Sequence, residues 1–266
     1  MANLAVAIVS WNVRELLRTC LHSLLTDLDR SGLESEIWVV DNASSDGTPG
    51  QVALEFPQVH LVASDTNLGF AAGSNLALRK IAQSHPTCDV TWVLNPDTEV
   101  IGGATRALLA CMASEPRAGI VGPQLVYSDG SLQQSAFRFP GLIQLAFELF
   151  RLPMRFYNTP LNGRYPERRY AQKRPFRVDH VLGAAMMVRM EAIAQVGLMD
   201  ERYHMYCEEI DWAWRLRRAG WRSFCVPEAQ VVHHAGRSTA QVPISSFVNL
   251  WTSRARLYAH YHSTAS

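Results

Sequence analysis

Apolar runs of strand length alternate with helix-like patterns through the first half of the chain. Residues 4–9 are continuously apolar, which is typical of a strand buried on both faces in a parallel sheet. Leucines then recur at helical spacing between positions 17 and 28. The same patterns predict strands at 37–40, 59–63 and 90–94, and helices from 48, at 70–82 and at 104–113. This alternation predicts an α/β fold with a doubly wound sheet.

Two of these helices begin with capping signals. Asn12 and Glu15 stand three positions apart before the first helix, which resembles a capping box. Thr48 followed by Pro49 is typical of an N-cap residue and a first helical position. We therefore expect side-chain caps from Asn12 and Thr48.

Regular patterns return in the last third of the chain. An apolar run predicts a buried strand at 181–188, and two shorter runs predict strands at 223–226 and 230–232. A helix is predicted at 208–219, where Gly220 provides a C-terminal stop. Residues 244–261 have the pattern of a final amphipathic helix.

The segment between these regular regions differs in charge and composition. From 138 to 177 the chain carries nine basic residues, and only Glu148 and Glu167 oppose them. Phenylalanine and tyrosine are interleaved with the basic residues, so the segment is interpreted as an insertion with its own chemistry. The basic residues are Arg138, Arg151, Arg155, Arg164, Arg168, Arg169, Lys173, Arg174 and Arg177.

Composition excludes several classes of protein. The chain has 266 residues, of which 48% are hydrophobic and 18% charged, and its net charge is +1, so intrinsic disorder and bulk nucleic-acid binding are both disfavoured. Five cysteines without CxxC spacing indicate reduced thiols in a cytosolic protein. The N-terminus lacks the pattern of a signal peptide, and the longest apolar stretch is too short for a membrane span.

Polar side chains follow three of the predicted strands at the point where each strand ends. The carboxyl ends of parallel strands meet at one edge of a sheet, where ligands bind in open α/β folds. Asparagine and aspartate are also ordinary turn residues, but three such endings together indicate a ligand site. The polar residues are Ser10, Asn12, Asp41, Ser44, Asp46, Asn95 and Asp97.

Asp97 is interpreted as a metal ligand. Two aspartates near a diphosphate would repel it unless a cation lay between them, and Mg²⁺ or Mn²⁺ could bridge Asp97 to phosphate oxygens. Asp41 is better placed to accept hydrogen bonds from a base or a ribose. The alternative for Asp97 is a helix N-cap or turn residue.

A glycine-containing segment follows the third strand. Asn67, Gly69, Phe70, Gly73 and Asn75 belong to a stretch in which backbone can approach a ligand closely, at a helix N-terminus that favours phosphate. The alternative is helix packing through small residues.

Acidic and histidine residues near the C-terminus complete the candidate chemistry. Glu208, Glu209 and Asp211 lie at a helix start, where the helix dipole favours carboxylates, but three in four positions suggest a general base. His233 follows a strand and could ligate a metal, although a structural histidine is an equal alternative.

With these residues assembled, the chain resembles the family-2 glycosyltransferases and, within them, the rhamnosyltransferase-like group. The order and spacing of the motifs are specific, and they extend over nearly the whole chain. The motifs occupy residues 10–12, 39–48, 67–75, 94–97, 183–186, 208–215 and 233–238.

The resemblance implies a GT-A (Rossmann-like) mixed sheet flanked by helices, with the basic aromatic insertion and a C-terminal helix. Four segments follow from it: a nucleotide-sugar-binding half at 1–127, the insertion or acceptor loop at 128–178, an acceptor and catalytic half at 179–243, and an amphipathic helix at 244–266. Asn95 and Asp97 fall on the family's DxD motif, with Asp97 on the metal and His233 completing the site. Glu209 falls on the base position, and Asp211 stays open as an alternative.

The resemblance also implies a reaction. A carboxylate removes the acceptor proton, the hydroxyl displaces the nucleotide diphosphate with inversion, and a divalent metal (Mg²⁺ or Mn²⁺) neutralises the leaving group. The donor favoured is dTDP-rhamnose, with UDP-sugars next, and the acceptor is a saccharide or a polyprenyl-linked saccharide of cell-surface polysaccharide synthesis. The insertion is hypothesised to contact an anionic membrane or a lipid-diphosphate acceptor, with a solvated acceptor loop as the alternative.

Two other functions stay open at this point. A catalytically weakened sugar-nucleotide-binding relative is compatible with Asn95 and Glu209, which replace the usual aspartates. A nucleotidyltransferase would use a similar site, but it usually carries a glycine-rich basic loop after the first strand. A NAD-dependent enzyme is excluded, because no GxGxxG follows that strand.

Overall fold

A mixed β-sheet forms the centre of the protein, whose computed structural model describes residues 3–150, 153, 156–157, 159–235 and 241–262. Within these residues the sheet has ten strands, and eight of them run in the order β3-β2-β1-β4-β11-β6-β12-β5. The other two are β7, beside β6, and β9, beside β12. The strands are β1 (Leu4–Ser10), β2 (Ser35–Asp41), β3 (His60–Ala63), β4 (Val90–Leu94), β5 (Thr98–Val100), β6 (Ala118–Val126), β7 (Leu132–Gln133), β9 (Phe176–Val178), β11 (Ala185–Arg189) and β12 (Arg222–His233).

The first four strands are parallel and adjacent. β1 pairs with β2 on one side and with β4 on the other, with Ile8 opposite Val39 and Leu94. β11 runs antiparallel to both β4 and β6, which makes the sheet mixed. The carboxyl ends of β1, β2 and β4 therefore lie at one edge of the sheet, as the sequence predicts.

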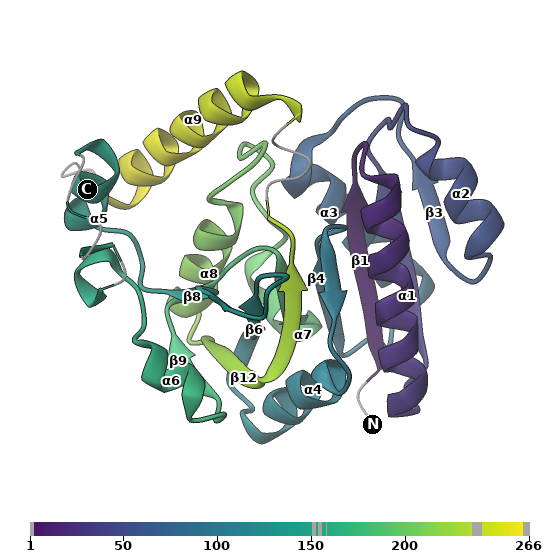
Figure 1. The fold of residues 1–266 in the computed structure, drawn as a ribbon, viewed down its shortest axis with the longest axis horizontal. Helices are drawn as coiled ribbons and strands as arrows, with labels where there is room; N and C mark the ends of the chain where they lie inside the picture. Colours follow the sequence, from purple (N-terminus) through teal and green to yellow (C-terminus); the bar gives the residue numbers. More distant parts are fainter. Residues whose placement is uncertain (1–2, 151–152, 154–155, 158, 236–240, 263–266) are drawn as a thin grey trace.

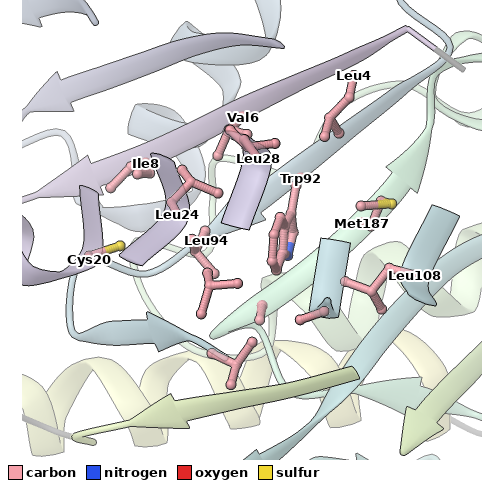
Figure 2. Close-up of a cluster of buried hydrophobic side chains, with 14 of the residues drawn as sticks. Leu4, Val6, Ile8, Cys20, Leu24, Leu28, Trp92, Leu94, Leu108 and Met187 are labelled. Atoms are coloured by element: carbon pink, nitrogen blue, oxygen red, sulfur yellow. The ribbon is translucent and has the colours of Figure 1, made fainter. Parts of the chain in front are cut away.

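Helices cover both faces of this sheet (Figure 1). The leucines of α1 and Leu108 of α4 pack against one face with Trp92 of β4 (Figure 2). Leu78 of α3 and Trp212 of α8 belong to a second buried cluster. The helices are α1 (Arg14–Ser31), α2 (Thr48–Glu55), α3 (Gly69–Ser84), α4 (Ala104–Ser114), α5 (Leu142–Leu149), α6 (Glu167–Ala171), α7 (Met190–Val196), α8 (Glu208–Arg218) and α9 (Pro243–His262), with a 3₁₀ turn η2 (Pro160–Asn162).

Both expected side-chain caps are wrong. α1 has Val13 as its N-cap without a side-chain hydrogen bond, because Asn12 instead accepts a hydrogen bond from the Ser45 N–H at 2.8 Å. Thr48 is already helical, and the N-cap of α2 is Gly47 in the left-handed conformation. The cap at this position comes from Asp46, whose Oδ1 accepts from the Thr48 N–H at 3.1 Å.

The strands predicted in the second half differ from the structure in two places, and several observed strands were not predicted. The single strand expected at 181–188 is two strands, β10 (His180–Val181) and β11, separated by residues 182–184. The two strands expected at 223–226 and 230–232 are one strand, β12, with an irregularity between Val226 and Gln230. β6 was not predicted, although it lies inside the sheet between β11 and β12.

The basic segment contains α5, η2 and α6 together with short strands at both ends. β8 (Ala136–Phe137) pairs with β10, and β9 pairs with β12, so both ends of the segment are joined to the rest of the fold by strand pairing. Arg168 and Arg169 lie on α6 and are exposed. Arg151 and Arg155 lie outside the described residues.

α9 runs along one edge of the molecule, as Figure 1 shows. Only Ser253 and Leu257 of its residues are buried. Among the described residues, no helix combines the length and apolar character that crossing a bilayer requires.

Candidate active site

A pocket of about 280 Å³ opens at the carboxyl ends of β1 and β4. Residues from the strand ends, from the start of α3, from residues 182–184, from the start of α8 and from the end of β12 line it together. Nine residues predicted from the sequence are among them. They are Ser10, Asn67, Gly69, Phe70, Asn95, Asp97, Glu208, Glu209 and His233.

Four other predicted residues shape the loops behind this pocket instead of lining it. Asp41 is buried, and its Oδ2 accepts from the Ser44 N–H at 2.9 Å. The Asn12 N–H donates to the Ser44 hydroxyl oxygen at 2.9 Å. Asp46 accepts from the Arg14 N–H at 2.9 Å besides capping α2. These contacts join the ends of β1 and β2, and a ligand role for the four residues stays a prediction.

Gly73, Asn75 and Asp211 also lie outside the pocket lining. A side chain at Gly73 would place its Cβ 2.8 Å from Val9, so this glycine lets α3 pack on β1. Asn75 donates to the Met199 carbonyl at 2.8 Å and to Glu201 at 2.9 Å. Asp211 accepts from Arg215 at 2.8 Å and from the Tyr261 hydroxyl at 2.7 Å.

Several buried polar atoms in the pocket have no hydrogen-bond partner among the described residues. A buried polar atom without a partner costs about 1–3 kcal/mol, so proteins seldom retain one without a ligand or a water to satisfy it. Their concentration in one pocket indicates a polar, charged ligand. The atoms are Ser10 Oγ, Asn42 Oδ1, Asn95 Oδ1, Asp97 Oδ1, Glu208 Oε2 and Glu209 Oε2.

His233 lies beside Asp97 because β12 pairs with β5, which places His233 opposite Thr98. The Nε2 atom of His233 is 3.5 Å from Oδ1 of Asp97. Its Nδ1 atom is 3.0 Å from the amide oxygen of Gln133, which can accept a hydrogen bond from an Nδ1–H group. With the proton on Nδ1, the lone pair of Nε2 would face the carboxylate oxygen, an arrangement that a cation between them would satisfy. Residues 236–238 of the predicted histidine motif lie outside the described residues.

Glu208 and Glu209 are both buried at the start of α8. Burial raises the pKa of Glu209 to about 7, although backbone N–H groups at the helix start act in the opposite direction. Burial and the charge of Glu209 together raise the pKa of Glu208 above its ordinary value. Both carboxyl groups therefore take up a proton more readily than a free glutamate does, and the pKa of Glu209 lies near neutral pH.

The turn that precedes α8 has an unusual backbone. Tyr206 and Cys207 are consecutive residues with φ of 70° and 68°, a conformation that costs a side-chain-bearing residue about 1–3 kcal/mol. α9 holds this turn: the Ser253 hydroxyl donates to the Met205 carbonyl at 2.8 Å, and Leu257 packs with Tyr203 and Cys207. The position of Glu208 and Glu209 therefore depends on α9.

The start of α3 contacts the same turn. The Phe70 N–H donates to the His204 carbonyl at 2.9 Å. Gly69 has φ +81°, and a Cβ there would lie 2.4 Å from that carbonyl oxygen. Only glycine allows the two segments to approach so closely. The sequence identified Gly69 but not its neighbour His204.

Three other contributors to the site, Gln133, Met205 and Tyr206, carried no sequence signal. Gln133, which orients His233, is separated from it by a hundred positions. Trp11 and Asn42 were visible as strand-end residues, whereas Met205 and Tyr206 precede the predicted helix in an irregular stretch. Their place in the site follows from tertiary packing alone.

Among the described residues, no group of three or more histidine, cysteine, aspartate or glutamate side chains could hold a metal ion by itself. Asp97 and His233 are a pair, and a metal bound there would need further ligands from the substrate or from water. Mg²⁺ and Mn²⁺ bound with substrate phosphates are commonly held in this way.

Comparison with known protein families matches residues 5–197 to the family described as "Glycosyl transferase family 2". The chain belongs to this family. The match includes the strand ends of the pocket and stops before Glu208. The expected resemblance is thereby confirmed, and the protein is a glycosyltransferase rather than a nucleotidyltransferase.

This glycosyltransferase is similar over most of its length to a protein of Mycobacterium tuberculosis. The two are 34% identical over 234 residues, which cover 86% of this chain and 72% of the relative. The relative is named "N-acetylglucosaminyl-diphospho-decaprenol L-rhamnosyltransferase". The similarity confirms the rhamnosyltransferase-like group expected from the motifs.

Solved structures share the fold. The mannosyltransferase PcManGT of Pyrobaculum calidifontis, in complex with GDP-Man and Mn²⁺, matches with a TM-score of 0.59 and 17% identity, covering 98% of this chain and 70% of that one. GalNAc-T7, solved with UDP, GalNAc and Mn²⁺, matches with a TM-score of 0.62 and 17% identity, covering 88% and 44%. These matches confirm the expected GT-A fold of the glycosyltransferase.

Proposed function

We propose that this glycosyltransferase moves L-rhamnose from dTDP-rhamnose to a polyprenyl-linked saccharide, with inversion at the anomeric carbon, in the synthesis of a cell-surface polysaccharide. UDP-sugars are the second choice of donor. The named relative acts on a decaprenol-linked N-acetylglucosamine diphosphate, which supports the lipid-linked class of acceptor. We place the reaction at the cytoplasmic face of a membrane, with the protein bound peripherally.

The observation that carries this proposal is the set of unpartnered polar atoms in one pocket. Asn95 and Asp97 present theirs on the side of the strand ends, and Glu209 presents one from α8. A bound nucleotide diphosphate would give hydrogen-bond or metal-bridged partners to the strand-end atoms, and a sugar hydroxyl would give one to Glu209. Ser10, Asn12, Asp41, Ser44 and Asp46 at the ends of β1 and β2 are proposed to support the nucleotide.

A divalent metal fits the pair formed by Asp97 and His233. The carboxylate oxygen of Asp97 has no hydrogen-bond partner among the described residues, and Nε2 of His233 lies 3.5 Å from it. Mg²⁺ or Mn²⁺ held there would neutralise charge on the departing diphosphate. Metal dependence is thus a proposal that the donor set supports.

Glu209 is the proposed base. Its pKa of about 7 matches the requirement for a carboxylate that accepts a proton near neutral pH. The acceptor hydroxyl gives its proton to Oε2 of Glu209 while its oxygen bonds to the anomeric carbon. The bond from that carbon to the diphosphate oxygen breaks, and the electron pair leaves with the nucleotide diphosphate.

Asp211 is the less favoured base. Both of its carboxylate oxygens already accept hydrogen bonds, from Arg215 and from Tyr261, and it does not line the pocket. Its contact with Tyr261 fastens α8 to α9. We therefore assign Asp211 to positioning α8, and we assign Glu208 to holding a proton beside Glu209.

A donor panel tests this function. The protein would be incubated with dTDP-rhamnose or UDP-sugars, with Mn²⁺, and with a short-chain prenyl-diphosphate N-acetylglucosamine acceptor, and nucleotide release and product mass would be measured. We expect dTDP release that requires both Mn²⁺ and the acceptor, with a product heavier by one deoxyhexose. Nucleotide release from UDP-sugars but not from dTDP-rhamnose would change the assigned donor to a UDP-sugar. No release from any combination would favour a sugar-nucleotide-binding relative without activity.

A further inference from the structure

Exposed apolar side chains are concentrated in α5, in the first turns of α9 and in the segments next to these two helices. Twelve large hydrophobic residues are exposed in the part of the chain that the structure describes, and nine of them lie at residues 142–150, 161 and 242–248. These three segments define what we call the α5/α9 surface. Single exposed hydrophobic residues are normal, but such a concentration is typical of an interaction site.

The first two turns of α9 are the most unusual part of this surface. Ile244 is 80% exposed, Phe247 63% and Val248 54%. None of the residues from 243 to 250 is buried, although this end of the helix is rich in apolar side chains. An amphipathic helix whose apolar side chains stay in water lacks the packing that normally stabilises it.

α5 continues the surface at the other end of α9. Arg254 of α9 forms an ion pair with Glu148 of α5 at 2.7 Å. The Tyr258 hydroxyl donates to the Gly141 carbonyl at 3.0 Å, just before α5 begins. Leu142 and Ile143 are exposed beside these contacts. Figure 1 shows α5 at the C-terminal end of α9, so the two helices form one edge of the protein.

The described part of this edge carries a small net positive charge. Residues 139–166 and 241–262 contain Glu148 as their only acidic residue, and Glu148 is paired with Arg254. In the part that the structure describes, the same stretches contain Arg164, Arg254 and Arg256. Exposed apolar side chains next to positive charge are complementary to a partner with an anionic surface above an apolar interior. An anionic lipid leaflet has both properties.

The α5/α9 surface also adjoins the pocket. The Gln241 side chain, just before α9, donates to the Asn12 carbonyl at 2.9 Å, which places this end of the helix beside the end of β1. Ser253 contacts Met205, which lines the pocket. An acceptor whose lipid stays in a membrane would therefore meet the pocket close to α9.

We propose that the α5/α9 surface binds the protein to an anionic membrane and orients the pocket toward lipid-linked acceptors. This inference rests on the proposed lipid-linked acceptor. It assigns the contact to apolar side chains of α9 and α5, whereas the exposed arginines of α6 lie elsewhere: Figure 1 draws α6 at lower left, apart from α9 at the top.

Vesicle flotation tests the proposal with the full chain. Wild type should float with vesicles of phosphatidylcholine containing about 30% phosphatidylglycerol and bind pure phosphatidylcholine more weakly. Ile244→Ser/Phe247→Ser/Val248→Ser should lower the bound fraction about tenfold or more. Leu54→Ser is the matched control, because Leu54 is 83% exposed on α2, outside this surface, and its change should leave binding intact. Arg168→Glu/Arg169→Glu/Arg174→Glu, called the α6 variant because two of its changes lie on α6 and the third just after it, should reduce binding less than the triple serine variant.

Three outcomes would overturn the proposal: wild type that floats with neither vesicle, a triple serine variant that floats as well as wild type, or loss of flotation only in the α6 variant. If wild type is dimeric by light scattering and does not bind vesicles, the surface is instead an interface with a second copy of the chain. Thermal melting checks that the exposed substitutions leave folding intact. Because flotation needs no donor, its result stands apart from the donor panel. Transfer to a water-soluble acceptor should be unchanged in the triple serine variant.

Discussion

The two sides of the pocket are built in different ways. The strand-end side, with Ser10, Asn95 and Asp97, follows parallel strands that hydrogen-bond on both edges and are buried in the core. The turn side, residues 203–209, has two consecutive residues at positive φ and is held by Ser253 and Leu257 of a mostly exposed helix. The strand-end side is thus rigid by construction, whereas the turn side depends on α9.

This difference suits a group-transfer enzyme. The diphosphate and the metal need fixed ligands, and strand ends supply positions that vary little. The base must be placed correctly relative to each acceptor that enters the pocket. Because the turn that carries the base packs on α9, a partner bound to α9 can affect the position of the base. We therefore expect changes on the strand-end side to abolish binding, and changes behind the turn side to reduce turnover while donor binding persists.

Asp97→Ala should have the largest effect on the strand-end side. Removing the unpartnered carboxylate takes away half of the proposed metal site, and the lost charge stabilisation should lower transfer by on the order of 10³-fold. Mn²⁺-dependent donor binding, measured by calorimetric titration, should be lost as well. Asp129→Asn, an exposed turn substitution, is the control. If donor binding by Asp97→Ala still depends on Mn²⁺, Asp97 is not a ligand of the metal.

Ser253→Ala and Leu257→Ala should have smaller effects, confined to the turn side. The serine change removes one hydrogen bond to Met205, worth about 0.5–1.5 kcal/mol, and the leucine change removes a buried side chain, worth about 2–5 kcal/mol. Steady-state kinetics should show a lower kcat for the serine variant and a still lower kcat for the leucine variant, with donor affinity close to wild type. A loss of donor affinity equal to the loss of kcat would mean that α9 supports both sides alike.

The same division explains what the sequence could predict. The strands of the first half are apolar runs bounded by turn residues, so their ends and the residues that follow them were found directly. β6 was missed because Gly119, Gly122 and Pro123 interrupt its apolar pattern. The strand expected at 181–188 was divided because residues 182–184 leave the sheet to line the pocket.

The turn side was only partly accessible to sequence reasoning. Glu208 and Glu209 were found as carboxylates at a helix start, but nothing local shows that Tyr206 and Cys207 take the left-handed conformation. The turn contacts α9, almost fifty residues later in the chain, through the hydrogen bond from Ser253 to the Met205 carbonyl. Gln133 and His233 are likewise brought together by the sheet alone, because β7 and β12 both pair with β6.

The most direct test compares donor binding and transfer in Glu209→Gln. The amide keeps the shape of the side chain but cannot take a proton, so donor affinity should match wild type while transfer falls by about 10²–10⁴-fold. Asp211→Asn, measured in parallel, should retain most of its activity and lose some thermal stability. Full transfer by Glu209→Gln together with an inactive Asp211→Asn would contradict the assignment of the base and, with it, the proposed meeting of the two sides in one catalytic pocket.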